Sequence, residues 1–356
     1  ICRLHRTTLS SCHMRFPELL SAARHHPICA AAAACALGAL AVLLAPGATA
    51  PKRTAIRIAC TDEAICDAAE AVAVDTWSEH RGAHLPLDIV VTPDGLAELS
   101  RRGIAWEVLV EDIDAVAREE RARLSSPAAQ NQEFFADYRD YRAITEKLIS
   151  LARQDPARVS LHGIGSSIEG RTIWALRIKG RAPDGKRTPM LVNGTLHARE
   201  WIAAMTATCL ADRAVQHDNN PVVRSLLDGT DLWVVPVANP DGYQYAWASN
   251  RYWRKNRRGK HGVDLNRNFS VAWGGSGSSK NERSEIYRGD RPFSEPETAA
   301  LRDLAMREGV KLHVDLHSYG QLLLYPWSYT GTPTKDAPRF SQLADRIGKA
   351  IFATHG

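Results

Sequence analysis

Hydrophobic and polar positions divide the chain into an apolar run near the N-terminus and two regions where strand and helix patterns alternate. In the first region we predict strands at 56–59, 74–78, 87–92 and 104–110, and helices at 62–73 and 93–102. Thr61 is the expected N-cap of the first helix, and Gly103 ends the second. The order β-α-β-β-α-β is ferredoxin-like. This unit, residues 54–117, has no convergent set of His, Cys and carboxylates, so we expect it to carry no chemistry.

Residues 133–356 have the pattern of a larger α/β domain. Strands are predicted at 159–164, 173–178, 190–196, 232–237, 311–316 and 322–325, and helices at 140–154, 201–216, 221–227, 295–307 and 338–352. The first two strands form a hairpin, residues 239–242 (Asn-Pro-Asp-Gly) form a turn, and residues 251–279 form a long loop of the kind that is usually functional. Strands that alternate with helices after an early hairpin predict a mixed β-sheet between helical layers.

The change from strand to helix before Trp201 carries the first candidate chemistry. His197 and Glu200 lie at this junction, where ligands collect in open α/β sheets. Taken alone, the pair could also be a polar helix start. A second polar cluster lies in a short strand-like frame at 263–269. This cluster, together with His317 at the end of the strand 311–316, favours a metal site. Two His and one Glu at strand ends are a zinc ligand set that leaves one position open for water.

Four motifs, in order along the chain, point to a known family. They are His197-Ala-Arg-Glu200, Tyr252-Trp-Arg-Lys255, Asp264-Leu-Asn-Arg267 and His317-Ser-Tyr319. Together they resemble the zinc metallocarboxypeptidases of the carboxypeptidase A/B kind, over roughly residues 133–356. The resemblance implies one Zn²⁺ ion held by His197, Glu200 and His317. It also implies hydrolysis of a C-terminal peptide bond by metal-activated water.

The resemblance assigns two residues to the chemistry around the metal. Asp264 matches a carboxylate that orients the first His ligand by accepting its other N–H, although a strand-end Asp in a turn is an alternative interpretation. Arg254 matches the arginine that stabilises the oxyanion when the carbonyl becomes tetrahedral.

Four further residues are matched to substrate binding. Asn266 and Arg267 correspond to the pair that grips the terminal carboxylate of the substrate, a task suited to the planar guanidinium group. This grip would make the enzyme an exopeptidase, because an internal peptide has no carboxylate to offer. Arg199 and Tyr319 correspond to residues of the outer subsites, and for Tyr319 a packing role fits almost equally well.

Residues 54–117 also resemble the activation pro-segment of this family, which covers the active-site cleft until it is removed. Residues 118–132 form the connector. Its first half, with Arg118, Arg121 and Arg123, can extend as a charged helix, and its second half is small and polar, so we expect a linker that a trypsin-like protease can cut. The expected partners are peptide or protein C-termini. Two alternative functions are a non-catalytic zinc-binding homologue that binds such C-termini and a zinc hydrolase of acyl-amino acids.

Residues 1–50 have the pattern of a secretory signal peptide. Basic residues precede the apolar run 28–45, and Ala48-Thr49-Ala50 offers small residues for cleavage. We expect a secreted protein, extracellular or periplasmic, without stable membrane insertion once the signal is removed, although the run could also span a bilayer as an uncleaved anchor. In an oxidising compartment Cys60 and Cys66 could pair, and two buried thiols are the alternative.

Composition and charge indicate the class of protein and its partners. The chain is 44% hydrophobic and 24% charged, as in ordinary globular proteins, and its net charge is +5. Tyr252 and Trp253 lie in the basic stretch 251–261, but we favour a solvated loop there and expect no nucleic-acid partner.

In the family, the glutamate that serves as general base lies farther downstream of His317 than residue 356. We therefore expect a catalytic domain truncated at its C-terminus, which holds zinc but hydrolyses weakly.

Overall fold

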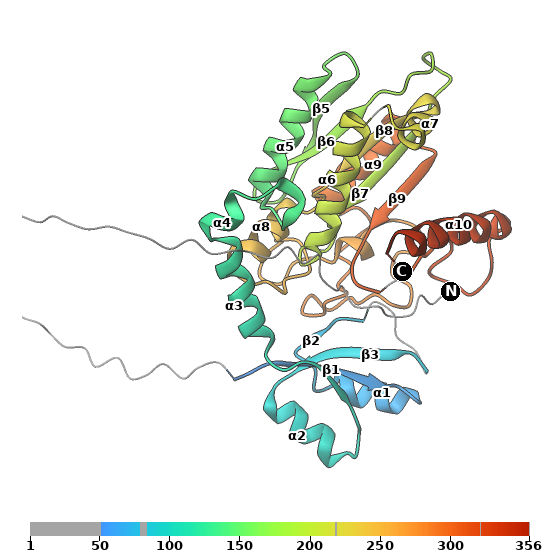
Figure 1. Cartoon of the computed structure of the whole chain (residues 1–356). Helices are drawn as coiled ribbons and strands as arrows, with labels where there is room; N and C mark the ends of the chain where they lie inside the picture. Colours follow the sequence, from blue (N-terminus) through green and yellow to red (C-terminus); the bar gives the residue numbers. More distant parts are fainter. Residues whose placement is uncertain (1–50, 79–83, 218, 321, 356) are drawn as a thin grey trace, which may run out of the picture.

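The computed structural model describes residues 51–78, 84–217, 219–320 and 322–355, which form a smaller N-terminal unit and a larger C-terminal unit (Figure 1). The expected signal peptide, residues 1–50, lies outside the described residues. Within the described ranges, no helix combines the length and the apolar character needed to cross a membrane.

The N-terminal unit is an antiparallel sheet with two helices on one face. Its elements are β1 (Thr54–Ala59), α1 (Glu63–Glu70), β2 (Asp75–Thr76), β3 (Pro86–Val91), α2 (Pro93–Arg101) and β4 (Glu107–Val110). The strands lie in the order β2-β3-β1-β4. Ile56 and Ile89 pack against the helices, whereas Ala55 and Val90 pack toward Tyr252 of the C-terminal unit. The helix-free face of the sheet therefore turns toward the larger unit, as the period-two alternation of β-strands allows.

The start of α1 differs from the expectation. Asp62, and not Thr61, is its N-cap, and the Asp62 side chain accepts a hydrogen bond of 2.9 Å from the backbone N–H of Ile65. A carboxylate at this position also interacts favourably with the helix dipole, which a threonine hydroxyl does less strongly. Cys60 and Cys66 form a disulfide that joins the end of β1 to α1.

The connector between the two units is mostly helical. Asp112 caps α3 (Ile113–Leu124), and Ser126 caps the short helix α4 (Pro127–Gln130), which has proline in its first turn. The polar stretch that we expected to be an irregular linker is therefore shortened to a few residues around Ser125. In Figure 1, α3 runs along one side of both units.

The C-terminal unit contains a five-stranded mixed sheet. Its elements are η1 (Phe134–Ala136), α5 (Tyr141–Gln154), β5 (Val159–Ser166), β6 (Thr172–Ile178), β7 (Thr188–Gly194), α6 (Trp201–Gln216), α7 (Pro221–Gly229), β8 (Thr230–Val235), α8 (Pro240–Ala248), η2 (Leu265–Arg267), α9 (Pro296–Arg307), β9 (Leu312–Leu316) and α10 (Ala337–His355). The strand order is β5-β6-β8-β7-β9. The β5-β6 and β6-β8 pairs are antiparallel, and the β8-β7 and β7-β9 pairs are parallel. The mixed sheet between helices predicted from the sequence is confirmed.

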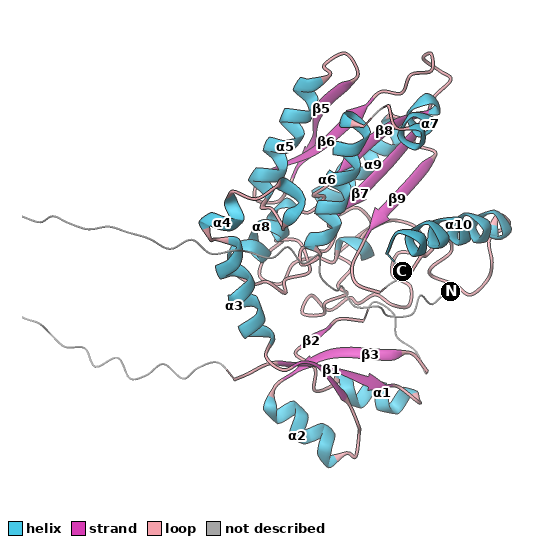
Figure 2. Cartoon of the chain, in the orientation of Figure 1, coloured by secondary structure: helices cyan, strands magenta, loops and turns pink. Residues whose placement is uncertain are grey.

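Apolar side chains cover both faces of this sheet. Leu232 and Val234 of β8 pack with residues of α5, α6 and α7, whereas Trp233 and Val235 pack with residues of α9. Figure 2 shows α5 and α6 on one side of the strands and α9 on the other. Because successive side chains of a strand point to opposite faces, a strand that is buried along its whole length, such as β8, requires a helical layer on each side.

Three local predictions were wrong. Residues 322–325 form no strand, because within the described chain they find no neighbouring strand with which to pair. Residues 239–242 are not an isolated turn but the start of α8, where Asn239 accepts a hydrogen bond of 3.0 Å from the backbone of Gly242. The polar cluster 263–269 lies around the short 3₁₀ helix η2 and not in a strand-like frame. In the last two cases the local capping side chain, Asn239 or Asp264, decides the conformation.

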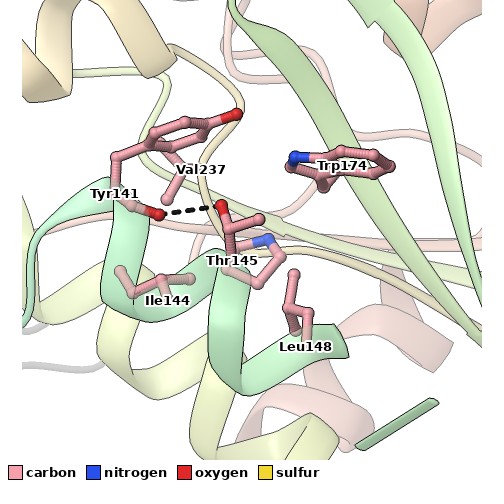
Figure 3. A pocket seen from close by; sticks show the side chains of 7 residues that line it. Tyr141, Ile144, Thr145, Leu148, Trp174 and Val237 are labelled. Carbon is pink, nitrogen blue, oxygen red and sulfur yellow. Dashed lines mark hydrogen bonds between the residues drawn. The ribbon is translucent and has the colours of Figure 1, made fainter. Parts of the chain in front are cut away.

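A small cavity between α5 and the sheet is lined mainly by apolar side chains (Figure 3). Its volume is about 10 Å³, roughly enough for one water molecule. Thr145 closes one side with a hydrogen bond of 2.8 Å to the backbone carbonyl of Tyr141. The cavity is too small for a substrate.

Candidate active site

The candidate site lies where two parallel strands end. β7 and β9 are neighbours, and Gly194 pairs with Leu316 at their carboxyl ends. His317 follows β9 directly, while His197 follows β7 by three residues and Glu200 is the residue before α6. The parallel register therefore brings together two motifs that lie more than a hundred residues apart, at the edge where open α/β sheets bind ligands.

Two imidazoles and one carboxylate converge there. The Nδ1 atoms of His197 and His317 lie 2.9 and 3.0 Å from the two oxygens of Glu200, and 3.1 Å from each other. Ligand atoms of these three residues all lie within 4.8 Å of one another. His197 and Glu200 are buried, and the side chain of His317 is half-buried. Nitrogen and carboxylate donors in this number fit a zinc ion that keeps one coordination position open.

A second carboxylate orients each imidazole. Nε2 of His197 is 3.2 Å from Asp264, and Nε2 of His317 is 2.9 Å from Asp315. A ring whose Nε2–H is held in this way presents the lone pair of Nδ1, which is the form a metal needs. Asp315 was not predicted as a site residue. A usable signal was its position two residues before His317, since residues i and i+2 of a strand share a face.

Burial and charge oppose each other in this cluster. Burial alone would raise the pKa of Glu200, but His197 and His317 outweigh it and bring the pKa down to about 2. Burial raises the pKa of Asp264 too, but the charge of Arg254 and the contact with His197 hold it well below its usual range. Both carboxylates are therefore ionised at neutral pH, which favours a cation beside them.

The residues expected to handle substrate lie around this centre. Arg254 is buried and its Nη2 donates a hydrogen bond of 3.1 Å to Asp264. The backbone N–H of Asn266 donates to the same carboxylate at 2.9 Å. Arg267 is half-buried, its Nε donates to the carbonyl of Gly277 at 2.7 Å, and its charge also lowers the pKa of Asp264. Asp264 thus links the candidate metal ligands to the residues expected to bind substrate.

The two residues expected in the outer subsites contact the N-terminal unit. Arg199 donates hydrogen bonds of 2.7 Å to the Asp75 carboxylate and 3.0 Å to the carbonyl of Thr76. Tyr319 donates a hydrogen bond of 2.7 Å to Asp88. The side of the site that would receive the remainder of a peptide therefore faces β2 and β3.

The fold and the donor set define a class, a metal-dependent hydrolase built on a mixed α/β sheet. The sequence model of the zinc carboxypeptidase family matches residues 144–356, and the chain belongs to this family. The family identified from the four motifs is thereby confirmed, together with the enzyme class, metallocarboxypeptidase, and the cofactor, one zinc ion.

Several relatives resemble most of the chain. Metallocarboxypeptidase A of Trichophyton rubrum is 35% identical over 299 residues, which cover 80% of this chain and 71% of that protein. Carboxypeptidase A1 of Mus musculus is 33% identical over 323 residues, covering 85% and 76%. Among solved structures, thrombin activatable fibrinolysis inhibitor aligns with a TM-score of 0.76 at 27% identity, covering 85% of this chain and 81% of that one. Carboxypeptidase A of Helicoverpa armigera also reaches 0.76, at 26% identity, covering 86% and 79%.

Proposed function

We propose that this chain is the precursor of a secreted exopeptidase that releases C-terminal residues from peptides and proteins, with zinc held by His197, Glu200 and His317. The observation that carries the proposal is the convergence of these three donors within 4.8 Å at the carboxyl edge of the sheet. Export would be directed by residues 1–50. When bound, zinc supplies Lewis acidity toward a peptide carbonyl and lowers the pKa of a water ligand.

The residues of the chain would divide the remaining work. Asp264 accepts the Nε2–H of His197, so that Nδ1 would present its lone pair to the metal. Arg254, anchored on Asp264 at 3.1 Å, is preorganised to stabilise negative charge on the carbonyl oxygen of the substrate. Arg267 and Asn266 would bind the terminal carboxylate, and this requirement would restrict cleavage to the last residue.

The N-terminal unit would act as an inhibitory pro-segment. Its Asp75 and Thr76 bind Arg199, and its Trp77 stacks on Tyr252 with ring centres 5.6 Å apart. Trp77 also meets the ring of Tyr319 edge-on at 6.3 Å. Aromatic and charged groups that would otherwise meet a peptide are therefore occupied from within the same chain.

Release of this unit would need cleavage in the connector. Arg118, Arg121 and Arg123 are exposed on α3 and are candidates for a trypsin-like protease. Arg123 forms an ion pair with Asp137, and Arg251 of the C-terminal unit forms one with Glu120. Since proteases bind extended segments, we expect the last turns of α3 to unfold before cleavage.

The exopeptidase assignment is tested with matched peptides that end in a free carboxylate or in an amide. The natural full-length enzyme, after trypsin treatment, should cleave the acid and spare the amide, because Arg267 has no partner in the amide. Arg267→Ala should lose roughly 2–5 kcal/mol of transition-state stabilisation on the acid, whereas Arg307→Ala, an exposed arginine on α9, should not. Equal rates on the two peptides would rule out recognition of the terminal carboxylate.

A further inference from the structure

The loop between Arg254 and Asp264 supplies two residues of the proposed site. It belongs to no helix and no strand of the main sheet, so its shape depends on hydrogen bonds made by its own residues. One of these residues, Asn256, is fully buried. A buried amide without partners is costly, so the contacts of Asn256 show what holds the loop in place.

Asn256 joins the two arms of the loop. Its backbone N–H donates to the carbonyl of Val263 at 3.0 Å, and its Oδ1 accepts the backbone N–H of Val263 at 2.8 Å. The same Oδ1 accepts the N–H of Arg258 at 3.2 Å. Asn256 follows Arg254 by two residues, and Val263 directly precedes Asp264, so these bonds set the separation of the two functional side chains.

The other end of the amide is anchored on the start of α9. Nδ2 of Asn256 donates to Glu295 at 2.7 Å and to Glu297 at 3.2 Å, and both glutamates are fully buried. Glu295 is held in turn by Arg258, whose Nε lies 2.7 Å from Oε2, and by the hydroxyl of Ser294. One amide therefore connects the loop to a rigid helix through two carboxylates.

We propose that Asn256 is a positioning residue: through Val263, Glu295 and Glu297 it fixes Arg254 and Asp264 against the metal ligands. The inference rests on the proposed function, since it deepens the account of the same site. An amide suits this place because it accepts from the loop with one end and donates to carboxylates with the other. Aspartate has the same shape but would set a third carboxylate against Glu295 and Glu297.

The test measures the zinc affinity of the chain by competition with a chromophoric chelator, at a temperature where every variant is folded. Asn256→Asp should weaken zinc binding by about 10-fold or more, the size of effect expected when a group that orients a ligand is displaced. The control is Asp231→Asn. Asp231 is another buried polar residue, at the start of β8, and it accepts hydrogen bonds from Gly180 and Arg187 in the segment between β6 and β7. The substitution should lower stability and leave zinc affinity unchanged.

A rescue separates positioning from general loss of structure. In the double variant Asn256→Asp with Glu297→Gln, the amide and the carboxylate of this pair exchange places, so a donor again faces an acceptor there, while Glu295 still faces the new carboxylate. Zinc affinity should therefore rise above that of Asn256→Asp without reaching that of the wild type. If Asn256→Asp does not fold, Asn256→Ser is measured in the same way and should again weaken zinc binding.

The outcomes distinguish a failure of the proposed metal site from a failure of the positioning role of Asn256. A wild-type chain that binds no zinc would contradict the proposed metal site itself. A wild type that binds zinc, with Asn256→Asp or Asn256→Ser binding it equally tightly, would overturn only the positioning role. A defect that the double variant does not relieve would also overturn it, because the pairing with Glu297 would then be irrelevant to the metal.

Discussion

Arg199 and Asp75, 124 residues apart in the sequence, form an ion pair of 2.7 Å between the two units of the protein. Their side chains are only 12% and 11% exposed, so the pair is largely shielded from solvent. Arg199 directly precedes Glu200, a proposed metal ligand. The N-terminal unit therefore reaches to within one residue of the proposed metal centre. It contacts the charge of Arg199, which we propose a substrate would also use.

Asp75→Ala should weaken the contact between the N-terminal unit and Arg199. Removing one partner of a largely buried ion pair costs roughly 2–5 kcal/mol, so the inhibitory contact should loosen by at least about 30-fold. We expect the uncleaved natural precursor of this variant to hydrolyse peptides faster than wild type. Glu111→Ala, which removes an exposed pair with Lys52 in the same unit, is the matched control and should leave the rate unchanged. An uncleaved Asp75→Ala precursor as silent as wild type would argue against inhibition through Arg199.

Asp315→Asn should weaken zinc binding without removing a ligand. Asp315 accepts hydrogen bonds from Nε2 of His317 at 2.9 Å and from Asn193 at 2.6 Å, and it orients the imidazole. Loss of such a partner typically costs 10–100-fold in metal affinity. Chelator competition measures the change, with His317→Ala as the complete loss and the exposed Asp303→Asn on α9 as the control. Wild-type affinity in Asp315→Asn would show that Asp315 plays no part in holding the metal.

Glu297 should make the folded state more stable at acidic pH than at neutral pH. Burial raises the pKa of its carboxyl from 4.5 to about 7, and the nearby charges of Glu295 and Asp241 act in the same direction. Its Oε1 has no hydrogen-bond partner among the described residues. The folded state therefore binds the proton more tightly than the unfolded state, so this stabilisation is present at low pH and is lost as pH rises from about 4.5 to about 7.

Glu297→Gln isolates this contribution because glutamine mimics the protonated acid. Relative to wild type, the variant should gain up to about 3 kcal/mol of unfolding free energy at pH 8 and little at pH 4. Urea unfolding at the two pH values measures the difference. Glu146→Gln, an exposed position on α5, should show no such pH-dependent gain. A gain for Glu297→Gln that is equal at both pH values would contradict a raised pKa.

The disulfide should stabilise the N-terminal unit alone. Cys60 and Cys66 close a loop within that unit, with a sequence separation of 6. Replacing both cysteines by serine should cost the unit about 2 kcal/mol, mainly through the greater freedom of its unfolded state. Differential melting should show an earlier transition for this unit in the variant and in reduced wild type, with the C-terminal unit unchanged. No change on reduction would mean that the bridge carries no stability.

Much of the fold and of the site could be predicted from local patterns. The period-two and period-3.6 spacings predict most strands and helices, because burying one face of an element requires that spacing. His197 and Glu200 could be recognised because both lie between the predicted strand 190–196 and the predicted helix 201–216. The four motifs then led to the family, because their residue types and their order along the chain can be recognised without any knowledge of the fold.

The tertiary structure decided which residues of these patterns meet. The parallel register of β7 with β9 sets His317 beside His197, and no local pattern specifies strand order. Asn256 and the pair of Arg199 with Asp75 were not predicted, because their partners are distant in sequence. Asp315 lies only two residues from His317, but its other partner, Asn193 on β7, is 122 residues away. Sequence spacing reports which side of its own element a residue occupies. Which partner lies across from that side depends on how the elements pack, and packing is a property of the whole chain.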